Sequence, residues 1–83
     1  MTDSAVNMLA LVEHLAKAVV EAPSEVTVEA FEEGGQTVLE LIVAESDLGR
    51  VIGRQGRMAR SLRMIVNAAS LRTRKRYQLE IVE

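Results

Sequence analysis

Two glycines three residues apart, Gly53 and Gly56, interrupt a stretch of the chain that otherwise has helical periodicity. Before them, a short helix is expected to reach about Val51, with Ser46 or Asp47 as its N-terminal cap. After them, residues 57–73 have the pattern of a long amphipathic helix. Glycine takes positive φ and has no Cβ, so the pair permits a sharp bend that another molecule can approach closely. The interruption therefore predicts a helix–loop–helix unit.

The rest of the chain predicts one more helix and three strands. A helix is expected over residues 4–21 and stops before Pro23. Its apolar stripe is Ala5, Leu9, Val12, Ala16 and Val19. Alternation predicts strands over residues 25–32, 37–44 and 76–82, with a turn at Gly34-Gly35. The order is α-β-β-α-α-β, an α+β fold in which a three-stranded sheet packs against three helices.

The length of 83 residues allows one domain. We expect a single domain over residues 1–83, made of a helix–hairpin part (4–44) and a helix–loop–helix–strand part (46–82). The chain has no cysteine and one histidine, so we expect neither a disulfide framework nor a metal site. No apolar stretch is long enough to span a bilayer and no signal peptide is visible, so a cytoplasmic protein is expected.

Charge is divided unevenly along the chain. Residues 1–45 carry nine acids and one base, whereas residues 46–83 carry three acids and nine bases. The two parts therefore have net charges of −8 and +6, although the whole chain has −2. A basic local surface can attract a polyanion whatever the overall charge. A solvated basic face is the simpler interpretation of the charge alone.

The glycine loop has the chemistry of a phosphate-backbone site. Main-chain N–H groups of the loop, and those that begin the following helix, can point at an anion. Arg50, Arg54 and Arg57 add positive charge around it. Gln55 can hydrogen-bond to sugar or phosphate oxygens, and Ile52 and Met58 can form an apolar floor for bases.

The loop has two other possible interpretations, an ordinary turn and a nucleotide-binding loop. A G-x-x-G sequence by itself is often an ordinary turn between helices. Neither the dinucleotide-binding pattern G-x-G-x-x-G nor the P-loop pattern is present. The helix–helix junction, the preceding pair Val51-Ile52 and the basic residue within the loop favour nucleic-acid binding.

The run Gly49-Arg50-Val51-Ile52-Gly53-Arg54-Gln55-Gly56-Arg57 resembles the KH signature. The whole chain resembles the bacterial single-domain KH-domain protein A (KhpA) family, which has the type II KH fold. The resemblance implies that the loop clamps about four nucleotides of single-stranded RNA. It places the bases in a groove between the flanking helices and the adjacent sheet edge. One departure is Ala59, where many KH domains have a large aliphatic residue.

The resemblance also implies a biological role. It is that of a small non-enzymatic RNA-binding protein, an RNA chaperone or post-transcriptional regulator, with no cofactor. Members of the family form homodimers, and some pair with a second, larger KH-domain protein. The residues expected to bind RNA are Gly49, Arg50, Ile52, Gly53, Arg54, Gln55, Gly56, Arg57, Met58 and Arg60. We expect aspartate at both Gly53 and Gly56 to abolish RNA binding and leave the fold intact.

The helix over residues 57–73 has two further surfaces. A narrow polar stripe contains Arg60, Arg63, Asn67, Ser70 and Arg74, and its first arginines either continue a phosphate track or form a solvated face. The apolar face is wider than one packing contact needs. Its outer residues are Met64, Ile65, Ala68 and Leu71. They are expected to form a dimer interface with a second copy of the chain. The alternative is that these apolar side chains are simply tolerated at the surface.

The basic cluster at residues 72–76 follows the end of the long helix, where positive charge is favourable. A secondary RNA contact is the alternative role for this cluster. The spacing suggests no catalytic group, so no enzyme is expected. The alternative function is a protein-interaction module that keeps the KH fold for docking or dimerisation.

Overall fold

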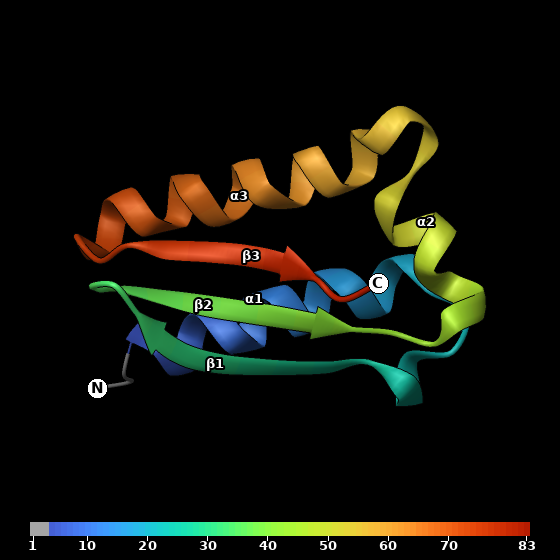
Figure 1. The fold of residues 1–83 in the computed structure, drawn as a ribbon, viewed down its shortest axis with the longest axis horizontal. Coiled ribbons are helices and arrows are strands. Elements are labelled where there is room, and N and C mark those ends of the chain that lie inside the picture. The colour runs from blue at the N-terminus through green and yellow to red at the C-terminus, as the bar shows by residue number, and fades with distance from the viewer. Residues whose placement is uncertain (1–3) are drawn as a thin grey trace.

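The computed structural model describes residues 4–83, with side chains from Met8 onward. Three α-helices and three strands follow the order α-β-β-α-α-β, as predicted (Figure 1). The helices are α1 (Ser4–Val19), α2 (Leu48–Ile52) and α3 (Arg57–Thr73), and the strands are β1 (Thr27–Glu33), β2 (Gln36–Ile42) and β3 (Tyr77–Ile81). Short 3₁₀ turns precede β1 (Pro23–Glu25), α2 (Glu45–Asp47) and α3 (Arg54–Gly56).

The sheet is mixed, in the order β1-β2-β3. β1 and β2 form an antiparallel hairpin, whereas β3 lies parallel to β2 at the edge of the sheet. α3 runs beside β3 in the opposite direction, so the start of α3 lies near the end of β3 (Figure 1). This arrangement places the helix–loop–helix unit at one end of the sheet.

The hydrophobic core joins α1 and α3 to one face of the sheet. The alternation predicted for the strands is confirmed in β2 and β3, because Leu39, Leu41, Tyr77 and Leu79 all point into this core. It is weak in β1, where Val28 is only partly buried and Ala30 is exposed. The helices contribute Met8, Val12, Ala16, Leu62 and Val66, and α2 contributes Val51. Removing a buried leucine side chain from such a core costs about 2–5 kcal/mol.

The first helix follows its predicted stripe in part. Val12 and Ala16 are buried and Leu9 is partly buried, as expected, but Met8 belongs to the core as well and was not predicted. The expectation for Ala5 lies outside the described side chains. α1 ends at Val19, before the predicted residue 21, and Pro23 begins a separate 3₁₀ turn.

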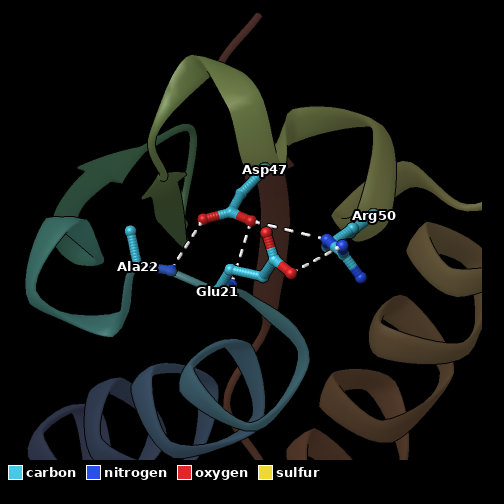
Figure 2. Close-up of polar contacts among 4 residues, drawn as sticks. All are labelled: Glu21, Ala22, Asp47 and Arg50. Atoms are coloured by element: carbon cyan, nitrogen blue, oxygen red, sulfur yellow. Dashed lines mark hydrogen bonds and ion pairs between the residues drawn. The ribbon is translucent and has the colours of Figure 1, made fainter.

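The expected N-terminal cap of α2 is wrong. No side chain caps this helix, and the carboxylate of Asp47 is turned toward residues 21 and 22, which follow α1 (Figure 2). It accepts hydrogen bonds from the N–H groups of Glu21 and Ala22, each at 3.0 Å. Asp47 is 1% exposed, so this buried carboxylate ties residues 21–22 to the start of α2.

No helix within residues 4–83 is long and apolar enough to cross a bilayer. Among the described residues, no group of three or more histidine and acidic side chains is placed to hold a metal ion.

Candidate nucleic-acid interface

The loop between α2 and α3 is a tight bend with left-handed backbone conformations. Gly53, Gln55 and Gly56 have φ values of 79°, 58° and 74°. Glycine reaches these values without steric cost, whereas Gln55 takes a conformation that few non-glycine residues adopt. The bend turns the side chains of Arg54 and Gln55 outward, and both are exposed.

Gly53 lies directly against the first turn of α3. A Cβ atom added to Gly53 would lie 2.7 Å from both the backbone nitrogen and the Cβ of Met58. By contrast, a Cβ at Gly56 would meet no atom within 4 Å. The expectation that aspartate at both glycines leaves the fold intact is therefore wrong at Gly53, because the loop must shift to accept any side chain there.

The glycine N–H groups are already used inside the protein. That of Gly53 donates to the Gly49 carbonyl at 2.8 Å, and that of Gly56 donates to the Gly53 carbonyl at 3.1 Å. Arg54 and Gln55, which lie between them, are the first two residues of the 3₁₀ turn Arg54–Gly56, and the first N–H groups of a helix have no partner within it. Both residues are also exposed.

Four arginines lie near the bend and differ in the groups that they contact. Arg54 and Arg57 are exposed and pair with no carboxylate of the described side chains. The Nη2 atom of Arg60 donates to the Gln55 carbonyl at 3.1 Å and so braces the loop. Arg50 is engaged elsewhere, with its guanidinium 3.0 Å from the Glu21 carboxylate and 3.7 Å from that of Asp47 (Figure 2).

Beside the loop, a cavity of about 250 Å³ opens between the start of α3 and the end of β3. Of the predicted residues, Ile52, Gly56 and Arg60 line it. Met58 does not, because its side chain packs against the hydrophobic core, and Gly49 is exposed on α2. Ala59, Ile81 and Glu83 also line the cavity and were not among the residues expected to bind RNA. Arg63, expected either on a phosphate track or on a solvated face, lines it as well.

The free edge of β3 forms the opposite wall. The Arg76 carbonyl and the Val82 N–H bond to β2, so alternate main-chain groups of β3, including those of Leu79, face away from β2. The Leu79 carbonyl accepts a hydrogen bond from Nε of Arg63 at 3.4 Å. The position of Arg63 on the polar stripe of the helix suggested that it could lie on a phosphate track. Only the fold shows that β3 faces Arg63.

The outer side of α3 exposes the apolar residues predicted for a dimer interface. Leu71 and Met64 are 83% and 65% exposed, and Ile65 is 41% exposed. Ala68 lies among them and is also exposed. Together these four side chains form an apolar strip on the side of α3 away from the core.

The G-x-x-G bend between two helices, with a preceding helix and hairpin and a parallel final strand, defines a type II KH domain. Residues 10–81 match the family described as "KhpA/KhpB, KH domain". The chain belongs to this family of KH-domain proteins.

Similar proteins from several bacteria carry the name RNA-binding protein KhpA. That of Borreliella burgdorferi is 40% identical over 77 residues, which are 93% of this chain and 94% of that protein. That of Clostridium acetobutylicum is 41% identical over 75 residues, covering 90% of this chain and all of that protein. These relatives are named as RNA-binding proteins and not as enzymes, in agreement with the prediction of a non-enzymatic protein.

Two solved structures share the fold. Aquifex aeolicus Era bound to GDP.AlF4⁻ superposes with a TM-score of 0.67 at 18% identity, over 98% of this chain and 31% of that one. Era in complex with MgGDPNP and nucleotides 1506–1542 of 16S ribosomal RNA gives a TM-score of 0.63 at 20% identity, over 89% of this chain and 28% of that one. The chain therefore spans under a third of each Era chain.

Proposed function

We propose that this protein binds single-stranded RNA through the loop Gly53–Gly56, as a non-enzymatic RNA chaperone or post-transcriptional regulator of the cytoplasm. The observation that carries the proposal is the exposed cationic bend at Arg54 and Gln55, whose N–H groups begin a 3₁₀ turn and so have no partner within that turn. The names of the KhpA relatives and the ribosomal RNA in one Era structure support RNA as the ligand.

The phosphates are assigned to the bend. Main-chain N–H groups bind phosphate oxygens without reading the base sequence, which suits a protein that contacts many RNAs. Arg54 and Arg57 supply positive charge beside these groups, and neither must first leave an acidic partner among the described side chains. Gly56 leaves open space where a side chain would otherwise stand between the bend and a sugar–phosphate strand.

The bases are assigned to the cavity beside the bend. Ile52 and Ala59 provide apolar contact there, and the main-chain groups of Ile81 on the free edge of β3 provide hydrogen-bonding partners. No aromatic side chain lines this cavity, so stacking on protein rings contributes little to its affinity. With about three phosphate contacts, the slope of log affinity against log salt is about −2.

The test is a charge change in the bend that spares the backbone. Arg54→Asp with Gln55→Asp places two carboxylates beside the phosphate site, and aspartate tolerates the left-handed conformation at position 55. Neither side chain is buried, so the fold is expected to be retained. Affinity for a labelled random-sequence single-stranded RNA, measured by fluorescence anisotropy, is expected to fall at least tenfold.

A matched control changes the net charge equally on α1. His14→Glu with Lys17→Glu also makes the chain more negative by three, at two exposed positions. This variant is expected to bind RNA within about threefold of the original protein. Equal losses in both variants, or no loss in the loop variant, would reject the clamp and leave the KH fold as a protein-interaction module.

We also propose a homodimer through the exposed apolar strip of Met64, Ile65, Ala68 and Leu71. An exposed apolar strip on one helix can pair with itself around a two-fold axis. Leu71→Asp is expected to convert a dimer to a monomer in sedimentation velocity at micromolar concentration. A monomeric original protein would reject the homodimer and favour a heterodimer with a larger KH-domain protein.

A further inference from the structure

Three neighbouring cavities that share lining residues follow α3 from the loop to a basic turn at its other end. The cavity beside the loop shares Arg63 and Ile81 with a second cavity of about 590 Å³, which follows β3. The second shares Gln36, Asn67 and Tyr77 with a third cavity of about 480 Å³. We call the three together the α3–β3 groove, and the residues Arg74, Lys75 and Arg76 that line its far end the basic turn.

The chemistry of the groove changes along its length. Arg60 and Arg63 line the end next to the loop. The middle is lined by the amide side chains of Gln36, Asn67 and Gln78 and by the carboxylate of Glu80. The Gln36 amide donates to Gln78 at 2.9 Å and that of Gln78 donates to Glu80 at 3.2 Å, so each amide has further donor or acceptor capacity for base edges. At the far end the three cations of the basic turn are exposed, and none forms an ion pair with a described carboxylate.

The backbone conformation of Arg74 is a second distinctive feature of the basic turn. Arg74 ends α3 in a left-handed conformation, with φ 61° and ψ 21°, a position that glycine occupies most easily. Its N–H donates to the Ser70 carbonyl at 3.0 Å, so the left-handed residue closes the helix as a glycine would. An arginine therefore stands where the fold itself requires no side chain, at the mouth of a groove.

We infer that single-stranded RNA held at the loop continues along the α3–β3 groove and that its phosphates reach the basic turn. The inference rests on the proposed RNA binding and extends its footprint. The 17 residues of α3 span about 25 Å at about 1.5 Å per residue, which at about 3.4 Å per stacked nucleotide corresponds to about seven nucleotides. The loop alone would hold about four.

The test compares two RNA lengths with one variant. Arg74→Gly with Lys75→Gln removes two positive charges and suits the left-handed position. The probes are labelled random-sequence single-stranded RNAs of four and twelve nucleotides. For the longer RNA, affinity is expected to fall several-fold. The slope of log affinity against log salt is expected to become less negative by about 1.4. For the shorter RNA, affinity is expected to stay within twofold.

The control is Lys17→Glu, which makes the same change in net charge on α1. It is expected to leave both affinities nearly unchanged. An NMR titration of the original protein adds a direct readout, in which the longer RNA shifts the amides of Asn67, Gln78 and Arg74 and the shorter RNA does not.

The outcomes separate this inference from the proposed function. If Arg54→Asp with Gln55→Asp weakens both RNAs while the basic-turn variant weakens neither, the clamp stands and the extended path is rejected. That result would assign the basic turn to another ligand, such as an acidic protein segment. Equal loss of both lengths in the basic-turn variant, or an equal loss in Lys17→Glu, would also reject the path. Unchanged binding in the loop variant would reject the clamp itself.

Discussion

The guanidinium of Arg50, on α2, lies 3.0 Å from the carboxylate of Glu21, which follows the end of α1 (Figure 2). Arg50 precedes Gly53 by one helical turn, so its charge is close to the proposed phosphate site. Because Glu21 partly neutralises it, RNA has to compete with a carboxylate for this arginine. The side chains are 51% and 75% exposed, so the pair contributes little to stability.

Replacing Glu21 with glutamine is therefore expected to strengthen RNA binding. The change removes the nearer of the two carboxylates paired with Arg50 and one negative charge near the loop. An exposed pair worth up to about 1 kcal/mol corresponds to about a two- to fivefold gain in affinity at low salt. Anisotropy titrations measure the gain. Glu33→Gln is the control, because it removes an exposed acid at the hairpin end of the sheet. An equal gain there would mean that only net charge matters.

Asp47 is expected to be a major determinant of stability. Asp47→Ala leaves the N–H groups of Glu21 and Ala22 without their acceptor, at about 1–3 kcal/mol for each lost partner. Urea unfolding should show a loss of about 2–4 kcal/mol for this variant and a smaller loss for Asp47→Asn, which keeps one oxygen. Ser46→Ala, at the exposed neighbour, is expected to cost under about 0.5 kcal/mol. A large effect at Ser46 would restore the capping role expected from the sequence.

The two glycines of the loop are expected to differ in their tolerance of alanine. Gly53→Ala brings a Cβ within 2.7 Å of Met58 and also places alanine at φ 79°, so a loss of about 2 kcal/mol or more is expected. Gly56→Ala has the conformational cost alone, about 1–2 kcal/mol. Thermal and urea unfolding of the two variants provide the comparison. Equal losses would mean that the contact with α3 does not constrain Gly53.

Arg74→Gly is expected to stabilise the fold by about 0.5–1 kcal/mol, because it removes a Cβ from a left-handed position. The matched change Arg72→Gly lies within the last turn of α3 and is expected to destabilise by up to about 1 kcal/mol. Both variants lose one arginine, so unfolding midpoints isolate the backbone effect. Destabilisation by Arg74→Gly would show that the arginine side chain supports the fold.

Local sequence patterns were sufficient to predict the elements. The predicted span of α3 agrees with Arg57–Thr73, and the inward residues Leu39, Leu41, Tyr77 and Leu79 follow from strand alternation. These predictions succeed because periodicity is a property of neighbours in the chain, and burial of one face then selects the orientation.

Contacts between distant parts of the chain were not predictable in the same way. The partners of Asp47 lie 25 and 26 residues earlier, and nothing near Asp47 in the sequence distinguishes this role from helix capping. Likewise, the approach of Met58 to Gly53 depends on the angle at which α3 leaves the loop. The glycine pattern located the bend, but only the fold shows that the N–H groups of Gly53 and Gly56 are bonded within the protein, to the carbonyls of Gly49 and Gly53.

The position of β3 has a consequence for synthesis on the ribosome. This strand supplies one wall of the groove, although it is encoded after both helices that flank the loop. A nascent chain that has released α2 and α3 but not residues 77–81 already presents the cationic bend, yet lacks the edge against which bases would lie. Under the proposed binding mode, such a chain makes sugar–phosphate contacts alone, and selectivity for bases arises only when the last strand adds to the sheet.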